Sequence, residues 1–125
     1  MPRLPLAFFS AAALCALGGM SWGIYMGSTE NFAMMPAHAH LNLVGWASLA
    51  IMGTFYALSG NGGRLGWVNW FLSVAGVVVM VPSLAMVLGG DKAAESGVIA
   101  GSVLAILGMA TFAVVVLSGW RTAKA

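Results

Sequence analysis

The chain has 125 residues, of which 61% are hydrophobic and only 6% are charged. Charged residues make up about a quarter of a typical soluble domain. The composition of this chain therefore excludes a soluble globular domain and indicates an integral membrane protein. The formal net charge of +2 comes from five scattered basic residues against three acidic ones, and it gives no indication of a nucleic-acid partner.

Four apolar runs are each long enough to cross a bilayer as a helix, which takes about 20 residues. The runs cover residues 5–27, 37–59, 66–89 and 97–119. A transmembrane β-barrel needs strict alternation of apolar and polar residues, and residues 77–81 (VVVMV) and 114–117 (VVVL) show none. The sequence therefore predicts an all-α membrane protein, with residues 1–125 forming a single four-helix transmembrane domain.

The first run, 5–27, carries glycines at four-residue spacing, namely Gly19, Gly23 and Gly27. Such spacing lets two helix backbones approach closely in lipid, so we expect a packing helix that stays in the membrane. A signal peptide is the alternative, because Arg3 precedes an apolar stretch rich in small residues. The glycine spacing favours the packing helix.

The second run opens with the sequence AHAHLNLVGW at positions 37–46, which holds both histidines of the chain. Histidine is costly inside a bilayer, so an intramembrane pair predicts a functional site, and neutral imidazole is a preferred ligand for heme iron and transition metals. Residues two apart on an α-helix are rotated by roughly 200°, so His38 and His40 face nearly opposite sides and do not share one ion. With no third histidine, a bis-histidine site must take its second ligand from another polypeptide. This predicts an oligomer with cofactors between its subunits.

Two neighbours of the histidines are candidates for supporting the site. Asn42 either hydrogen-bonds between helices, as intramembrane amides do, or supports the second nitrogen of a histidine ligand. Trp46, on the same run, either packs or contacts a cofactor. Packing between helices is the simpler role for both residues.

The third and fourth runs complete the bundle. A short glycine-rich turn, 60–66, joins the second run to the third, which makes these two helices antiparallel neighbours. The fourth run carries Gly97, Gly101 and Gly108, which give it another small-residue face for helix packing.

Basic residues indicate the orientation, because cytoplasmic loops of membrane proteins carry an excess of Lys and Arg. Arg3, Arg64, Arg121 and Lys124 fall on one side of a four-span topology, and Lys92 is the only basic residue on the other. Both termini are therefore predicted to lie in the cytoplasm, with the histidine pair near the outer face of the membrane.

The histidine motif resembles a motif of known membrane oxidoreductases. His38-Ala39-His40 is similar to the H-x-H of the tenth helix in the catalytic subunit of heme-copper oxidases and nitric oxide reductases. There, one histidine binds the high-spin heme and the next but one binds the low-spin heme. The chain is also similar to small four-helix bacterial proteins named as oxidase subunit I-like, which share a pattern close to HAHLNLVGW. The resemblance covers one helix by sequence and the rest by topology, and it implies a location in the bacterial cytoplasmic membrane.

The oxidase subunit arranges twelve helices as three four-helix arcs, so the resemblance implies a homotrimer of this chain. In such a ring, His38 of one protomer would meet His40 of its neighbour across a b-type heme. Both axial positions of the iron would then be filled, which suits electron transfer with a donor and an acceptor that the sequence does not identify. The oxidases hold copper with three further histidines, and this chain has two in all. The resemblance therefore does not extend to a complete oxidase.

Two other functions are consistent with the same residues. Met34, Met35, His38 and His40 lie within seven residues near the predicted outer face, and a set of thioethers and imidazoles suits copper. Alternatively, the protein is a non-catalytic assembly partner whose histidines hydrogen-bond between helices.

Overall fold

The computed structural model describes residues 1–60 and 62–119 of the chain. Every regular element in these residues is helical. Four helical segments are long and apolar enough to cross a membrane, namely Arg3–Thr29, Met35–Ser59, Gly63–Leu88 and Lys92–Gly119. The predicted all-α architecture with four spans is thus confirmed. Each span begins a few residues before its predicted start, because the helices continue past the apolar runs into more polar ends.

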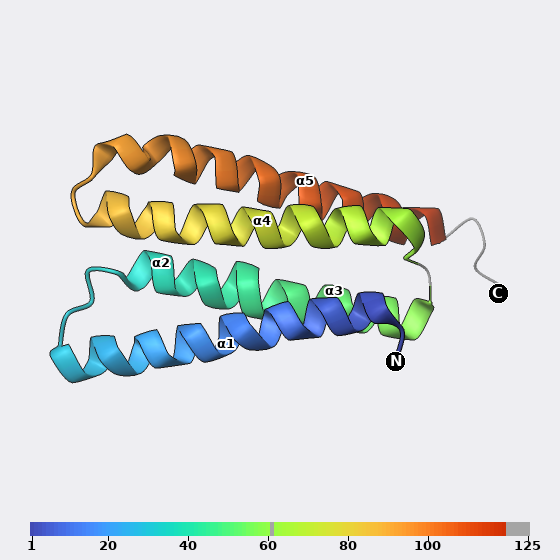
Figure 1. Ribbon diagram of the computed structural model, residues 1–125, viewed down its shortest axis with the longest axis horizontal. Coiled ribbons are helices and arrows are strands. Elements are labelled where there is room, and N and C mark those ends of the chain that lie inside the picture. The colour runs from blue at the N-terminus through green and yellow to red at the C-terminus, as the bar shows by residue number, and fades with distance from the viewer. Residues whose placement is uncertain (61, 120–125) are drawn as a thin grey trace.

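The first two spans form an antiparallel pair (Figure 1). α1 (Arg3–Thr29) is one unbroken helix, whereas the second span consists of α2 (Met35–His40), a π-helical segment η1 (Leu41–Ala47) and α3 (Ser48–Ser59). α1 packs along both η1 and α3. Glu30 ends α1 in the left-handed conformation, with a φ of 52°, and the chain then turns back toward α2.

The last two spans form a second antiparallel pair (Figure 1). α4 (Gly63–Leu88) and α5 (Glu95–Gly119) are joined through the short 3₁₀ turn η2 (Lys92–Ala94). α5 packs mainly on α4, while α4 also contacts α1, α2 and η1. α4 therefore connects the two pairs.

Glycines on α5 explain how closely the last two helices approach. A Cβ added at Gly101 would lie 2.5 Å from the backbone nitrogen of Met80, and one added at Gly108 would lie 2.5 Å from the Ser73 hydroxyl. Neither position has room for a larger residue unless the helices separate. The small-residue face predicted for the fourth run is therefore confirmed, and it packs within the chain.

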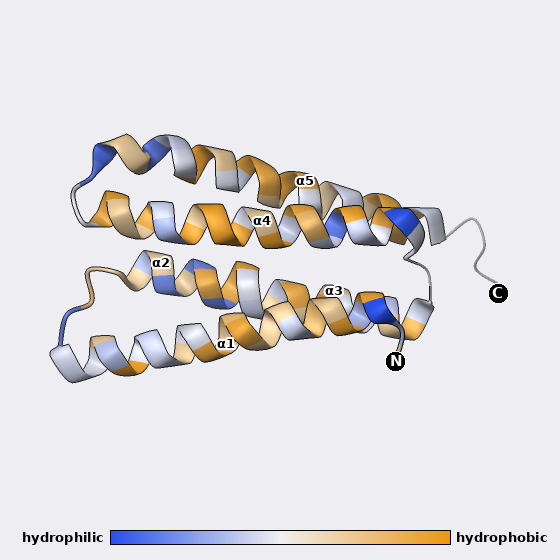
Figure 2. Cartoon of the chain, in the orientation of Figure 1, coloured by the Kyte–Doolittle hydropathy of each residue, from blue (hydrophilic) through white to orange (hydrophobic). Residues whose placement is uncertain are grey.

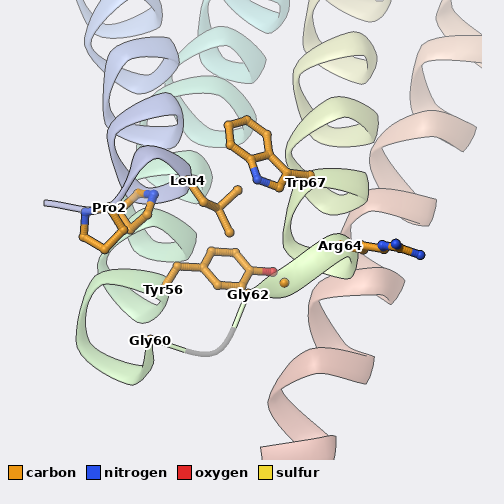
Figure 3. Close-up of a pocket in the computed structure, with 9 residues that line it drawn as sticks. Pro2, Leu4, Tyr56, Gly60, Gly62, Arg64 and Trp67 are labelled. Carbon is orange, nitrogen blue, oxygen red and sulfur yellow. The ribbon is translucent and has the colours of Figure 1, made fainter.

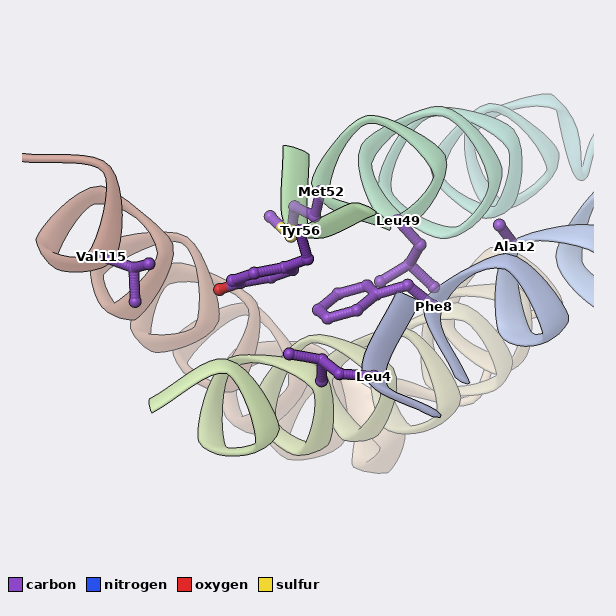
Figure 4. Packing of buried hydrophobic residues seen from close by; sticks show 7 residues of the cluster. All are labelled: Leu4, Phe8, Ala12, Leu49, Met52, Tyr56 and Val115. Carbon is purple, nitrogen blue, oxygen red and sulfur yellow. The ribbon is translucent and has the colours of Figure 1, made fainter. Parts of the chain in front are cut away.

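A cluster of buried hydrophobic side chains joins α1, α3 and α5 near the amino-terminal end of α1 (Figure 4). The Phe8 ring stacks on the Tyr56 ring with centroids 5.3 Å apart, and Phe112 meets both Phe55 and Tyr56 edge-on. Elsewhere the helices present hydrophobic side chains outward, and hydrophilic residues gather mostly toward the ends of the bundle (Figure 2). This distribution fits a bundle surrounded by lipid. The members of the cluster are Leu4, Phe8, Ala12, Leu49, Met52, Tyr56 and Val115.

A buried polar chain lies beside this cluster and was not predicted from the sequence. Asn69 on α4 is fully buried and its Nδ2 donates to the Tyr56 hydroxyl at 2.9 Å. Ser73, one turn later, donates from its Oγ to the Asn69 Oδ1 at 3.0 Å. An unpaired polar group in a membrane interior costs roughly several kcal/mol. These hydrogen bonds therefore tie α3 to α4 and favour the one alignment of the two helices in which the three side chains are paired.

Candidate functional site

The two histidines lie in the last turn of α2, directly before the π-helical segment η1. At the end of η1, the backbone N–H of Ser48 bonds to the carbonyl of Leu43, five residues back, and the Ser48 Oγ donates to the same oxygen at 2.7 Å. Gly45 lies inside η1, and a Cβ there would lie only 2.8 Å from the Cys15 Sγ on α1. The span predicted at 37–59 is therefore helical as expected, but it departs from a regular α-helix over this segment. Single π-helical turns are rare and frequently lie at functional sites.

His38 is half-buried against α1. A Cβ added at Gly23 would lie 3.1 Å from the His38 Cε1, and the Trp22 ring meets the imidazole edge-on at a centroid distance of 6.5 Å. The Nδ2 of Asn42 lies 3.4 Å from the His38 Nδ1. The imidazole is thus held between an aromatic ring, a glycine and an amide of its own chain.

Asn42 follows one turn later on the same side of the helix. Its Nδ2 donates to the His38 carbonyl at 2.9 Å, and a Cβ added at Gly19 would lie 2.5 Å from its Oδ1. The four-residue spacing of Gly19 and Gly23 on α1 therefore matches that of His38 and Asn42 on the facing helix. The close-packing role predicted for these two glycines is confirmed, whereas a Cβ at Gly27 would have no neighbour within 4 Å.

His40 leaves the helix on another side and is exposed. Its Nδ1 lies 2.7 Å from the Pro36 carbonyl oxygen. Since a carbonyl oxygen can only accept, the Nδ1 carries the hydrogen and donates it. In the neutral ring, the lone pair then belongs to Nε2. This geometry fits an axial ligand of heme iron, because histidine ligands commonly donate their other ring N–H to a backbone carbonyl.

The prediction that the two histidines face opposite sides agrees with these contacts, since the His38 side chain packs against α1 and His40 is exposed. Among the described residues, no group of three or more His, Cys, Asp or Glu side chains is placed to hold a metal ion. The two imidazoles therefore lie on separate sides of the span, and a six-coordinate heme iron bound by either one would need its other axial ligand from elsewhere.

The remaining predicted site residues are Trp46, Met34 and Met35, whose side chains are exposed or lie near other neighbours. Trp46 is 44% exposed on the surface of η1, and Met35 is 47% exposed at the start of α2. The terminal methyl group of Met34 lies 3.9 Å from where a Cβ of Gly89 would be, at the end of α4. Of the residues proposed as a copper set, Met34 thus lies near the end of α4 and His38 lies against α1, while Met35 and His40 are exposed.

Comparison with known proteins adds no assignment. No protein-family model, no curated protein and no solved structure matches this chain. The resemblance to heme-copper oxidases consequently depends on the histidine motif and the number of helices. The chemistry of the histidine pair is the basis for a functional interpretation.

Proposed function

We propose that this chain is a b-type heme protein of the membrane, in which each heme is held between neighbouring copies by His40 of one protomer and His38 of the next. Three copies would form a homotrimer with three equivalent hemes near the outer face. The role of such a protein is electron transfer between partners still to be identified. The observation that carries the proposal is the hydrogen bond from the His40 Nδ1 to the Pro36 carbonyl, at 2.7 Å.

That hydrogen bond supports ligation in two ways. It selects the tautomer in which Nε2 has the free lone pair, and it fixes the plane of the ring before any iron arrives. His40 is also exposed on an apolar helix, beside Leu43, which is 64% exposed. A neutral imidazole directed out of a lipid-embedded helix is costly unless something binds it. Coordination of the imidazole to a heme iron shared with a neighbouring subunit would remove this cost.

His38 supplies the reason for preferring a ring to a twofold dimer. It lies on the α1 side of the helix, so His38 and His40 face different neighbours. A twofold axis pairs identical surfaces and would join His40 to His40, leaving His38 without a function in ligation. A cyclic arrangement uses both histidines of every chain, and the resemblance to a twelve-helix oxidase core favours three copies.

When bound, a bis-histidine heme supplies one-electron transfer and has no open coordination position for a substrate. The chain's own residues would orient the ligands and keep water away. The Trp22 ring and Gly23 hold the His38 imidazole, and the Pro36 carbonyl holds His40. With both histidines engaged, the chain has no histidine left for copper, so we do not propose oxygen or nitric oxide reduction.

The first test is an absorption spectrum of the detergent-purified protein, oxidised and dithionite-reduced, with heme and metals quantified per chain. We expect about one heme per chain and a sharp reduced α-band, as six-coordinate bis-histidine b-type heme gives. His38→Ala and His40→Ala should each lose most of the heme, while the matched control Leu43→Ala, also at an exposed position of this span, should retain it. Unchanged heme content in both histidine variants would reject the proposal.

Co-expression of the two variants tests the arrangement between subunits. In a randomly mixed ring, a chain that keeps His40 is followed by one that keeps His38 at about a quarter of the interfaces, and these interfaces should regain heme. If His40 paired with His40, the His38→Ala variant alone would keep all its heme. If both ligands came from one chain, mixing would restore none.

A structural role is the second candidate, because one observation favours it. His38 and Asn42 fill the space over the two α1 glycines, so they hold α2 and η1 against α1 whether or not heme is bound. If the purified protein contains no heme, cannot be reconstituted with it and loses stability on His38→Ala, this second function is the correct one. Stoichiometric copper in the same preparation would instead support the thioether and imidazole set.

A further inference from the structure

His38 and His40 differ in what their ring nitrogens contact before any ligand arrives. The Nδ1 and Nε2 of His38 lie 3.4 and 3.5 Å from the Asn42 Nδ2. They also lie 3.9 and 3.7 Å from the position that a Cβ of Gly23 on α1 would take. His40 is exposed, and its Nδ1 donates to the Pro36 carbonyl. The His40 ring therefore meets a ligand from outside where it stands, whereas both nitrogens of His38 lie against groups of their own chain.

The imidazole of His38 has to separate from α1 before it binds heme. The Cβ position at Gly23 is closer to the His38 Cε1, at 3.1 Å, than to either nitrogen, so α1 lies beside the edge of the ring that carries both nitrogens. A porphyrin extends to every side of its iron and is much wider than an imidazole, so a heme bound through either nitrogen would overlap α1. Ligation by His38 and packing of His38 against α1 consequently exclude each other.

Several contacts stabilise the packed position of His38. The Trp22 ring meets the imidazole edge-on at a centroid distance of 6.5 Å, and the residue is half-buried. The Asn42 Nδ2 donates to the His38 carbonyl at 2.9 Å, and the same amide fills the space over Gly19. The side chain that lies over the imidazole is thus itself anchored to the helix and to α1. The packed position is therefore the major one in the protein without heme.

We propose that His38 exchanges between this packed position and an outward position, and that heme is bound first by His40 of one protomer and then by His38 of the next. The inference rests on the proposed function and adds an order of ligation to it. The apparent affinity for the second axial ligand is reduced by the fraction of chains in which His38 is outward. The contact with α1 thus regulates how completely the heme becomes six-coordinate, and weakening that contact strengthens ligation.

The first measurement needs no heme. Diethyl pyrocarbonate modifies accessible neutral imidazole, and tandem mass spectrometry of the full chain, labelled in detergent, gives the rate at each histidine. We expect His40 to be modified at least about tenfold faster than His38, because the outward state of His38 is a minor one. Gly23→Ala crowds the imidazole, whose Cε1 is 3.1 Å from the added Cβ, and should accelerate modification of His38 about fivefold. The matched control is Gly27→Ala, where nothing lies within 4 Å, and it should change the rate less than about twofold.

The second measurement follows the binding of hemin to the heme-free full chain by stopped-flow absorption. We expect a first phase whose rate rises with the hemin concentration and a second phase whose rate does not, because release of His38 from α1 is a step of the protein itself. The second phase should convert a high-spin spectrum into the low-spin spectrum of a bis-histidine heme. Gly23→Ala should accelerate the second phase about fivefold, and Gly27→Ala should leave it unchanged.

Two histidine variants assign the phases. His38→Ala should keep the first phase and lack the second, whereas His40→Ala should lack both. The His40→Ala variant also corrects for hemin bound elsewhere, for example in the cavity of about 380 Å³ at the other end of the bundle, which Pro2, Leu4 and Trp67 line (Figure 3). Neither histidine is among the described residues that line this cavity, so hemin held there gives the same signal in every variant.

The outcomes separate this inference from the proposed function. Equal modification of the two histidines, or a single phase that gives the low-spin spectrum directly, would overturn the inference and leave heme binding intact. Equal acceleration in Gly23→Ala and Gly27→Ala would also overturn it, because the effect would then not come from the contact with His38. If hemin gives neither phase, the proposed function fails and the inference fails with it.

Discussion

The glycines of α1 provide a graded test of how closely the histidine-bearing span packs on α1. Gly19, Gly23 and Gly27 lie one turn apart on the same helix, yet an added Cβ would meet very different surroundings. At Gly19 it would lie 2.5 Å from the Asn42 Oδ1, at Gly23 it would lie 3.1 Å from the His38 Cε1, and at Gly27 nothing lies within 4 Å. Replacement of each glycine by alanine therefore adds the same methyl group to three different gaps.

The expected magnitudes follow from these distances. Each substitution gains the same helix propensity, about 0.8–1.0 kcal/mol in aqueous hosts, so that gain cancels when the three variants are compared with one another. The Asn42 amide is anchored by its bond to the His38 carbonyl and cannot simply turn away. We therefore expect Gly19→Ala to be less stable than Gly27→Ala by about 1–3 kcal/mol, the usual cost of overpacking. Gly23→Ala should fall between them, because the imidazole needs to move by only a few tenths of an ångström.

The assay is reversible unfolding of the purified protein in mixed micelles of dodecyl maltoside and increasing SDS, followed by circular dichroism. The order of stability should be Gly27→Ala, then Gly23→Ala, then Gly19→Ala. If all three variants unfold at the same SDS fraction, α1 does not approach the second span as closely as the structure has it. The packing argument for His38 would then be wrong.

The same titration tests two other contacts. Asn69→Ala removes the partner of both Tyr56 and Ser73, and we expect a loss of about 1–3 kcal/mol for the polar groups left unpaired; a variant as stable as the wild type would show that water enters this region. Gly101→Ala would place a Cβ 2.5 Å from the backbone nitrogen of Met80, which cannot rotate aside. We therefore expect the free energy of unfolding to fall by about 1–3 kcal/mol. An unchanged midpoint for this variant would contradict the close packing of α4 on α5.

The four spans and their packing faces were predictable from the sequence for simple physical reasons. Length and hydropathy define a membrane helix. The spacing of Gly19 and Gly23 places these two on one face of α1, and the spacing of Gly101 and Gly108 places those two on one face of α5. The divergence of the two histidines was predictable too, because it depends only on the rotation between residues two apart in a regular helix.

Two features of the structure could not be predicted in this way. The π-helical segment has no local signal, since a run containing Gly45 and Trp46 is equally compatible with an α-helix. The close approach of Gly45 to Cys15 on another helix likewise cannot be read from the local sequence. The buried chain through Asn69 was missed because one polar residue in an apolar run indicates neither its partner nor its depth. Only the pairing of α3 with α4 brings Tyr56 within reach of it.

The segment η1 has a consequence for how this span can change by insertion and deletion. A π-helical turn accommodates one residue more than an α-helical turn, so deleting a single residue from Leu41–Ala47 can be absorbed by a return to regular α-helix. In a regular α-helix, deletion of one residue would instead turn the part before it by about 100° relative to the part after it. With the deletion absorbed in η1, the core contacts of α3 and the contacts of His38 with α1 would both be kept. The histidine end and the core end of this one span therefore tolerate the loss of one residue between them without a change in their relative orientation.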